Sequence, residues 1–256
     1  MKRIDHRILL AAITLGGFAL RLVRLDFQPL WWDEGYSIFF ATRDFRTMLE
    51  RTAVDIHPPL YYALLQIWMA FAGTSQVAAR LLSVVIGVAA IPLIYLLAIK
   101  LFAQRRVALI AALLLAVSPL HIYYSQEVRM YGLVTLLCLA SVYLFVQLLG
   151  MPPGKPKTAI VAVAYILVTT AALYTQYYAA FIVVFEILVF AILFVRHSSL
   201  APRNSFVHWI AAWLGIAALY LPWAIYAGGK LYTYITAKKA IEQYSSLDPI
   251  TYLAQH

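Results

Sequence analysis

PLWWDEGY, residues 29–36, directly follows the first apolar segment of the chain, residues 8–25. Two adjacent carboxylates, Asp33 and Glu34, therefore stand beside two tryptophans at the level where a membrane helix leaves the bilayer. Trp and Tyr favour that depth because their rings are apolar and carry a polar N–H or O–H group. A carboxylate beside such a surface is suited to accept a proton. For this stretch alone, the alternative is an ordinary solvated start of a helix.

The composition indicates the class of protein. Hydrophobic residues make up 64% of the 256 residues and charged residues 12%, with a mean hydropathy of +0.81. A soluble globular protein is about half apolar and a quarter charged, whereas several apolar runs here reach the roughly 20 residues that cross a bilayer as a helix. We therefore predict an all-α, polytopic membrane helix bundle. Its only cysteine, Cys138, excludes an intrachain disulfide or a cysteine-based metal site.

The apolar runs predict about seven transmembrane helices, at residues 8–25, 79–99, 107–119, 128–149, 158–173, 179–195 and 207–227. Between the first two runs lies the longest polar interval, residues 26–78, which we interpret as the first extracytoplasmic loop. Residues 228–256 form a mixed tail that we place on the same side. No internal repeat is visible, so the whole chain, residues 1–256, is treated as one module.

The distribution of charge predicts the orientation in the membrane. With the N-terminus in the cytoplasm, the cytoplasmic segments hold half of the 20 Lys and Arg residues and one acid, Asp5, while the outer segments are nearly balanced. Short loops rich in Lys and Arg remain on the cytoplasmic side. We therefore predict a multi-pass protein of the inner (plasma) membrane with a cytoplasmic N-terminus. The net charge of +9 then reflects topology rather than binding of nucleic acid.

The loop of residues 26–78 carries two predicted interfacial helices. Residues 36–52 place apolar side chains on one helical face and charged ones on the other, as in a helix that lies on a membrane. The consecutive prolines at 58–59 stop the chain and can begin a second helix at about residues 60–71. That helix is too short to span, so we expect the loop to return to the membrane surface and bring His57 near Asp33. The alternative for His57 is a hydrogen-bonded turn residue.

Four motifs follow one another along the chain: WWDEGY at 31–36, HPPLYY at 57–62, SQEVRMY at 125–131 and YTQYYAAF at 174–181. With their placement between the predicted helices, they resemble the polytopic GT-C glycosyltransferases that use lipid-linked sugars. The resemblance is greatest to the branch that contains protein O-mannosyltransferase-like and aminoarabinose-transferase-like enzymes, and it covers roughly residues 8–195. It implies that the chain is the N-terminal portion of such an enzyme.

By this resemblance, Asp33 and Glu34 are the candidate catalytic residues. Asp33 would be the general base that takes a proton from an acceptor hydroxyl while that oxygen attacks the anomeric carbon of a polyprenyl-phosphate-linked sugar, with inversion. The acceptor would be a lipid, a glycan or a protein outside the cytoplasm. Because adjacent side chains diverge, we assign Glu34 to orientation or charge balance.

The resemblance and the residue types also suggest contacts to the donor phosphate. Arg129 has the planar guanidinium that binds phosphate at two points, and the other candidates are His57, Tyr61 and Tyr177. Some relatives have Lys where His57 stands, so its role stays open, and Tyr177 could instead belong to an interfacial aromatic belt. Glu127 matches a region where some relatives place an acid that binds a divalent metal such as Mg²⁺ or Mn²⁺, whereas others work without metal. Alternatively, Glu127 and Arg129 form a local ion pair that caps the fourth helix.

Two charged residues lie within predicted membrane helices. Arg80 opens the second helix, where we expect its side chain to extend to the lipid headgroups. Glu186 lies near the middle of the sixth helix, where an acid is costly unless it is protonated or paired. We expect Glu186 to form a buried hydrogen bond to a tyrosine.

The sequence is therefore interpreted as a membrane glycosyltransferase, or its N-terminal portion. One alternative is a transporter or flippase for an anionic lipid, which would account for Glu127, Arg129 and Glu186 but usually shows paired repeats. Another is a non-catalytic scaffold subunit of the same shape. Because relatives continue through further helices, we expect these 256 residues to need a partner subunit that completes the groove for the lipid-linked donor.

Overall fold

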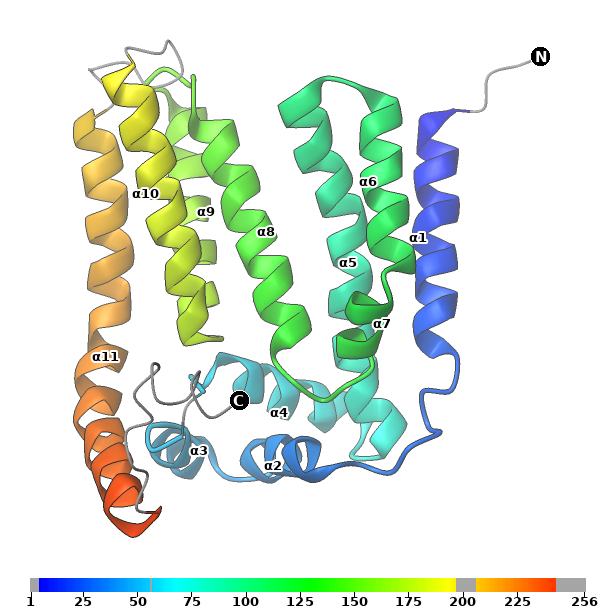
Figure 1. Cartoon of the computed structure of the whole chain (residues 1–256), viewed down its shortest axis with the longest axis vertical. Helices are drawn as coiled ribbons and strands as arrows, with labels where there is room; N and C mark the ends of the chain where they lie inside the picture. Colours follow the sequence, from blue (N-terminus) through cyan, green and yellow to red (C-terminus); the bar gives the residue numbers. More distant parts are fainter. Residues whose placement is uncertain (1–4, 56, 197–205, 243–256) are drawn as a thin grey trace, which may run out of the picture.

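The computed structural model describes residues 5–55, 57–196 and 206–242, and every regular element in these ranges is helical. In chain order the elements are α1 (His6–Leu22), α2 (Trp32–Ala41), α3 (Phe45–Thr52), α4 (Leu60–Ala72), α5 (Gln76–Phe102), α6 (Arg105–Val117), α7 (Pro119–Ser125), α8 (Tyr131–Leu148), α9 (Pro156–Leu173), the 3-10 turn η1 (Tyr177–Ala179), α10 (Ala180–Val195) and α11 (Phe206–Glu242). The long helices run side by side, and α2, α3 and α4 lie across one end of them (Figure 1).

The bundle is that of a multi-pass membrane protein. In the described ranges, five helical segments are long and apolar enough to cross a bilayer: α5, α8, α9, η1 with α10, and α11. A sixth is formed if α6 and α7, which are bent by 57° at their junction, count as one span. The 17-residue α1 packs against α5 and α6 and runs alongside them (Figure 1). The predicted helical membrane bundle is confirmed, while the count of seven crossings stays a prediction.

The crosswise helices differ from the prediction for the first loop. One amphipathic helix was expected over residues 36–52, but α2 ends at Ala41 and α3 begins at Phe45. The break arises because Asp44 is an N-cap whose carboxylate accepts a hydrogen bond of 3.0 Å from the Thr47 backbone N–H. Three short helices therefore lie on this end of the bundle instead of two, and α4 forms where the second was expected.

A proline decides the shape of the α6–α8 region. Pro119 has no N–H to continue α6, so α6 ends at Val117 and Ser118 caps a separate helix, α7. The helix predicted at 107–119 thus begins and ends two residues earlier, and the one predicted from residue 128 begins only at Tyr131. As a consequence, residues 126–130 form an irregular connection at the same end of the bundle as α2–α4 (Figure 1).

The last helix, α11, extends to Glu242, beyond the end expected at residue 227. The first part of the predicted outer tail is therefore a continuation of the helix, because no Pro interrupts residues 223–242. The expected surface helix at Asp248-Pro249 lies outside the described residues.

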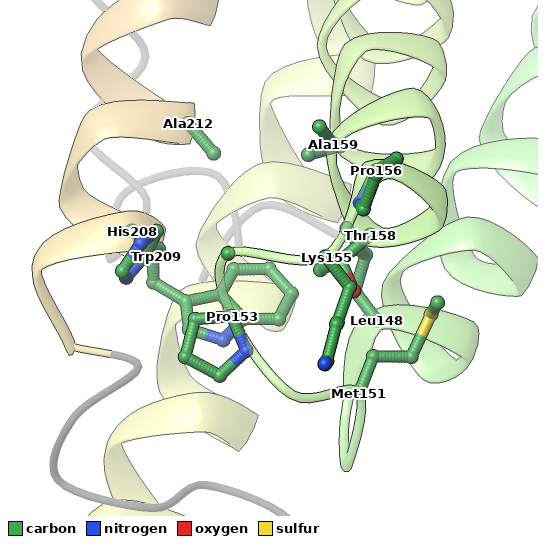
Figure 2. A pocket seen from close by; sticks show the side chains of 12 residues that line it. Leu148, Met151, Pro153, Lys155, Pro156, Thr158, Ala159, His208, Trp209 and Ala212 are labelled. Atoms are coloured by element: carbon green, nitrogen blue, oxygen red, sulfur yellow. The ribbon is translucent and has the colours of Figure 1, made fainter.

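An apolar cavity of about 340 Å³ lies at the opposite end of the bundle from the crosswise helices. The α8–α9 turn and the start of α11 enclose it, with Trp209, Pro153 and Lys155 among its lining residues (Figure 2). None of the candidate site residues lines this cavity.

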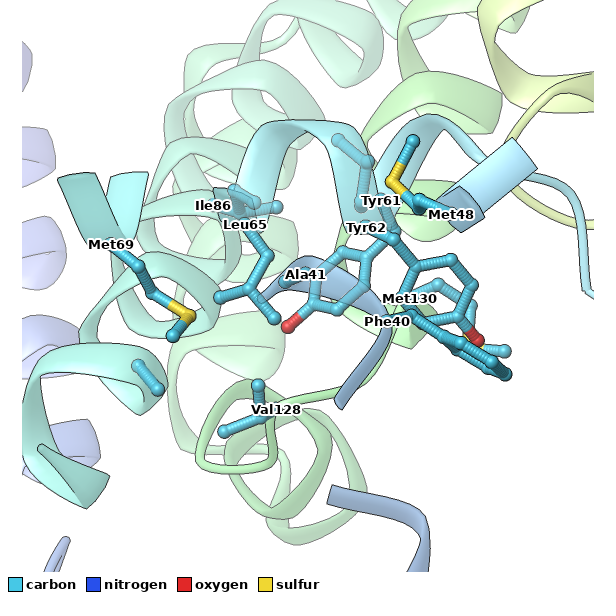
Figure 3. Packing of buried hydrophobic residues seen from close by; sticks show 12 residues of the cluster. Phe40, Ala41, Met48, Tyr61, Tyr62, Leu65, Met69, Ile86, Val128 and Met130 are labelled. Atoms are coloured by element: carbon cyan, nitrogen blue, oxygen red, sulfur yellow. The ribbon is translucent and has the colours of Figure 1, made fainter. Parts of the chain in front are cut away.

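The crosswise helices are held on the bundle by a hydrophobic cluster. It joins Phe40 of α2, Tyr61 and Leu65 of α4 and Val128 and Met130 of the α7–α8 connection (Figure 3). Tyr61, Leu65 and Val128 are fully buried. Burying such side chains stabilises the fold by about 1.5–3 kcal/mol each. This packing fixes the connection of residues 126–130 against α2 and α4, and so positions its polar side chains.

Candidate active site

Glu34 and Arg80 form a buried ion pair at the start of α2. Glu34 is fully buried and Arg80 is 6% exposed. Arg80 donates to both carboxylate oxygens, Nη2 to Oε2 at 2.6 Å and Nε to Oε1 at 2.8 Å. Arg80 Nη1 also donates to the carbonyls of Leu25 and Gln28. The expectation that Arg80 extends to lipid headgroups is therefore wrong, because α2 places a carboxylate within reach inside the protein.

The Glu34 carboxylate also binds two backbone groups. It accepts a hydrogen bond of 2.9 Å from the Val128 N–H of the α7–α8 connection. It also reaches back to the N–H of Trp31, the N-cap of its own helix. Glu34 thereby ties together α2, α5 and the α7–α8 connection, a geometry that suits orientation and charge balance. A direct role in chemistry for this residue stays an untested prediction.

Asp33, the preceding residue, faces the other way. Its side chain is 36% exposed, and its Oδ2 lies 3.6 Å from Nη2 of Arg129. Arg129 Nη1 also donates to the Asp33 carbonyl oxygen at 3.3 Å. The carboxylate is thus close to a cation yet open to an incoming molecule. This combination suits a proton acceptor that works beside an anionic ligand.

Arg129 lies in the α7–α8 connection and is 4% exposed. Its Nη2 lies 3.5 Å from Nε2 of His57, and its Nε has no hydrogen-bond partner among the described residues. The ion pair that Arg129 makes among the described residues is with Asp33, so the structure does not support the alternative of a local pair with Glu127. A buried guanidinium with a free donor next to an accessible carboxylate is suited to bind a further anion.

His57 completes a chain of polar side chains. Its Nδ1 lies 3.2 Å from Oδ2 of Asp55, and its side chain is 12% exposed. When Nδ1–H donates to Asp55, the Nε2 lone pair faces the Arg129 guanidinium. The four side chains run in the order Asp55, His57, Arg129, Asp33. The loop thus brings His57 to the side of Asp33, as its length and turn residues predicted, with Arg129 between them.

Glu127 is two residues from Arg129 in sequence but forms no ion pair with the four side chains just described. It is 7% exposed, and its Oε2 has no hydrogen-bond partner among the described residues. Burial raises the pKa of Glu127, the charges of Glu34 and Asp33 add to this, and Tyr123 and Arg129 oppose it. The described ranges hold no group of three His, Cys, Asp or Glu side chains that could bind a metal ion. A divalent cation at Glu127 therefore stays a prediction without a ligand set.

Among the described residues, neither candidate tyrosine hydrogen-bonds to Asp33 or Arg129. Tyr61 is fully buried in the hydrophobic cluster, and its hydroxyl pairs with Ser83 at 3.0 Å. It has no surface left for a substrate, so we remove it from the candidate site. Tyr177, in η1, packs against the small cluster that contains Ala53 and Trp223 of α11. Its role in binding stays an untested prediction.

The sequence analysis did not assign two residues, Asp55 and Arg80, to the site. Asp55 stands two residues before His57, and an acid so close to a candidate His is a usable signal for a carboxylate that orients the ring. Arg80 was recognised as unusual but assigned to lipid. Only the fold shows that its partner, Glu34, is 46 residues away in the chain.

Glu186 does not belong to this site. It is fully buried in α10, where its carboxylate accepts from the Tyr165 hydroxyl at 2.7 Å and the Ser141 hydroxyl at 2.8 Å. The expected hydrogen bond to a tyrosine is confirmed. The network joins α8, α9 and α10 and acts in packing of the bundle.

The fold and site define a multi-pass membrane protein with a polar cluster under three crosswise helices. Residues 56–226 match the family model of dolichyl-phosphate-mannose-protein mannosyltransferases. The chain belongs to this family of membrane glycosyltransferases. The matched range begins after Asp33 and Glu34, so these two residues are placed by the structure and not by the family match.

A solved structure gives the same fold. The chain is similar to the structure of the S. cerevisiae protein O-mannosyltransferase Pmt1-Pmt2 complex bound to the sugar donor, with a TM-score of 0.60 and 16% sequence identity. The similarity covers 93% of this chain and 34% of the yeast chain. This chain thus spans about a third of the length of that relative. No curated protein matches the sequence.

Proposed function

We propose that the chain carries the catalytic end of a membrane glycosyltransferase that moves a sugar from a polyprenyl-phosphate donor to an acceptor hydroxyl. The observation that carries the proposal is the pairing of the partly exposed Asp33 carboxylate with the buried Arg129 guanidinium at 3.6 Å. Such a pair offers a base to the acceptor and a cation to the leaving phosphate side by side. Membership of a mannosyltransferase family supports this use of the pair.

In the proposed reaction, Asp33 is the general base. Its carboxylate takes the proton of the acceptor hydroxyl while the hydroxyl oxygen forms a bond to the anomeric carbon. The bond from that carbon to the phosphate oxygen breaks at the same time, and the electron pair leaves with the polyprenyl phosphate. Because attack and departure occur on opposite faces, the anomeric centre is inverted.

Arg129 and His57 would act on the phosphate side. A leaving phosphate gains negative charge in the transition state, and a preorganised guanidinium in a site shielded from water stabilises that charge strongly. Arg129 has an unused Nε–H in the described structure and is held by His57 and Asp33 on its outer nitrogens. His57 keeps its orientation through Asp55, so this pair would fix the position of Arg129.

The Glu34–Arg80 pair would position the base without taking part in the chemistry. It binds the first turn of α2, which carries Asp33, to α5 and to the backbone of Val128. Val128 directly precedes Arg129 in sequence. One buried ion pair therefore sets the distance between the proposed base and the proposed phosphate ligand.

The partners follow from the same proposal. The donor would be a hexose or pentose on a polyprenyl phosphate, and the acceptor a lipid, a glycan or a protein on the outer face of the inner (plasma) membrane. The related yeast structure is a complex of two chains, which supports a partner subunit here too. No step of the proposed reaction requires a divalent cation, and a metal bound by Glu127 stays a separate prediction.

The test is the lipid-linked species that accumulates when the protein is removed from its cell. We expect a polyprenyl-phosphate sugar to accumulate, as measured by mass spectrometry of extracted lipids. Wild-type protein should clear it, and the Asp33→Asn variant, present at the same level, should not. If the variant clears it as well, the protein acts as a scaffold or transporter and not through this base.

A further inference from the structure

Arg21, in the last turn of α1, is a fully buried cation. In the described ranges, no carboxylate oxygen lies within 4.0 Å of its guanidinium nitrogens. A buried charge without an ion partner is costly unless its donors are hydrogen-bonded. The role of Arg21 therefore depends on the neutral groups that it binds.

All five N–H groups of this guanidinium have an acceptor. Nη1 donates to the carbonyls of Gly17 and Ala116, at 2.7 and 3.1 Å. Nη2 donates to the carbonyl of Leu115 at 3.3 Å and to Nδ1 of His121 at 2.7 Å. Nε donates to the hydroxyl oxygen of Ser125 at 3.2 Å. One side chain of α1 thus joins the end of α6 to both the first and the last turn of α7.

The two carbonyls of α6 lie where Pro119 interrupts the helix. The last four carbonyls of an α-helix have no N–H partner within it. Pro119 stands four residues after Leu115, where the partner of that carbonyl would be, but it has no N–H. A cation near the C-terminus of a helix also interacts favourably with the helix dipole. Arg21 therefore caps α6 at the point where the chain bends by 57° into α7.

The end of α7 also packs closely on a glycine of α5. A Cβ atom at Gly87 would lie 2.8 Å from Cβ of Ser125, closer still to its hydroxyl oxygen, and 3.5 Å from Nε of Arg21. Side chains do not approach one another so closely, so Ser125 occupies this position only because residue 87 has no side chain. Helix α7 is thus held between α1 and α5 (Figure 1).

The α7–α8 connection, which directly follows α7, is fastened to α1 as well. The side-chain amide of Gln126 donates to the carbonyls of Arg21 and Val23, at 3.0 and 2.9 Å. The same connection then brings Arg129 to Asp33. A shift of α7 would therefore move the guanidinium of Arg129 relative to the Asp33 carboxylate.

We propose that Arg21 is a positioning residue for the candidate active site: its guanidinium fastens α7 to the end of α6 and so sets where Arg129 stands beside Asp33. The inference rests on the proposed function and adds to it a residue that acts through α7 and not by contact with a ligand. A cap that only stabilised the bundle would affect all of its helices alike. A positioning residue affects the α7–α8 connection in particular.

The test compares variants of the full-length protein in lipid nanodiscs. Arg21→Met removes every N–H of the side chain, and Arg7→Met is its control, because Arg7 is exposed on the same helix. Gly87→Ala should push Ser125 away from α5 without changing Arg21 itself. Its control is Gly16→Ala, since nothing lies within 4 Å of a Cβ atom at that position. Arg21→Lys keeps the charge with three N–H groups in place of five, and it carries the test together with Gly87→Ala if Arg21→Met fails to fold.

Hydrogen exchange measured by mass spectrometry reports on the connection without any assay of activity. The Val128 N–H is bonded to the Glu34 carboxylate and so protected from exchange. We expect exchange in residues 126–130 to become about tenfold faster in Arg21→Met and Gly87→Ala. The increase should be smaller in Arg21→Lys and absent from both controls, while exchange in α9 stays as in the wild type. Unchanged exchange in residues 126–130, or an equal increase in every helix, would overturn the proposal.

A double-mutant cycle shows whether Arg21 acts through Arg129. With dolichyl phosphate mannose as the donor, we expect Arg21→Met to raise the donor KM about fivefold. The double variant with Arg129→Ala should be no worse than Arg129→Ala alone, because two changes that act through one group do not add. Effects that multiply would also overturn the proposal.

The two measurements separate this inference from the proposed function. If Asp33→Asn keeps its transfer rate, the assignment of the base is wrong, but the exchange of residues 126–130 still tests the role of Arg21. If that exchange is unchanged in Arg21→Met, the role of Arg21 is wrong, and the result for Asp33→Asn is unaffected.

Discussion

Asp33 and Glu34 are consecutive residues whose carboxylates occupy opposite environments. Glu34 is fully buried against Arg80 at 2.6 Å, whereas Asp33 is 36% exposed and 3.6 Å from Arg129. Adjacent positions on a helix point about 100° apart, so the first turn of α2 can direct one acid inward and the other outward. The inner acid anchors the helix to the bundle, and the outer acid remains available for chemistry.

Loss of Arg80 should destabilise the fold far more than loss of a surface arginine. Arg80→Ala leaves Glu34 buried without its partner, which typically costs about 3–5 kcal/mol. Arg46→Ala removes an exposed pair with Glu50 and should cost about 0.5 kcal/mol. Thermal unfolding in detergent measures both variants. Similar melting temperatures for the two would mean that the buried pair does not hold α2 in place.

Arg129 should matter for the donor more than for the acceptor. Arg129→Ala removes the guanidinium beside Asp33, so we expect KM for the polyprenyl-phosphate sugar to rise at least tenfold. Arg129→Lys should restore only part of the loss, because Lys keeps the charge but not the planar fork. Arg43→Ala is the control, since Arg43 is exposed and its guanidinium packs on Phe39. An unchanged donor KM in Arg129→Ala would assign Arg129 to structure alone.

Glu186 should contribute to the stability of the bundle through its hydrogen bonds and not through charge. Glu186→Gln keeps an oxygen and a nitrogen near Tyr165 and Ser141, so we expect a loss of about 1 kcal/mol or less. Glu186→Leu leaves both hydroxyls without this acceptor and should cost about 2 kcal/mol or more. Thermal unfolding of the two variants is the measurement. An equally large loss for both variants would show that the negative charge itself is required.

The orientation in the membrane can be tested at the two ends of α5. Thr74 and Gln104 are exposed and flank this 27-residue helix, which is about 40 Å long. In a Cys138→Ala background, we expect a cysteine at Thr74 to react with an impermeant thiol reagent in intact cells. A cysteine at Gln104 should react only after the cells are opened. The reverse pattern would place Asp33 in the cytoplasm and exclude an extracytoplasmic acceptor.

Local patterns in the sequence predicted much of the fold. The apolar runs located the long helices, because a bilayer requires a continuous apolar surface of fixed length. The Pro-Pro pair predicted the start of α4. The break between α2 and α3 was missed because the apolar periodicity continues through it, and only the cap by Asp44 reveals it. Helix α7 was not predicted, because Pro119 was interpreted as the end of the preceding helix and not as the first residue of a new one.

The site was predictable in its residue types but not in its pairings. Asp33, His57 and Arg129 stand in recognisable motifs at helix ends, so the sequence located them at one side of the membrane. Which cation meets which acid depends on packing between segments far apart in the chain. Glu34 therefore pairs with Arg80, and Arg129 with Asp33 rather than with the nearby Glu127. A sequence pattern contains no such long-range distances.

The most direct test of the account is sugar transfer by Asp33→Asn beside Asp26→Asn. The two substitutions remove the same charge from the same loop, and Asp26 is exposed. Both proteins are assayed with dolichyl phosphate mannose and membrane extract from cells that lack the protein, with melting temperatures measured in parallel. We predict that Asp33→Asn loses about 100-fold or more of the transfer rate, as for loss of a general base, while its melting temperature and the activity of Asp26→Asn stay near wild type. Retention of more than about a tenth of the rate by a folded Asp33→Asn protein would contradict the assignment of Asp33 as the base.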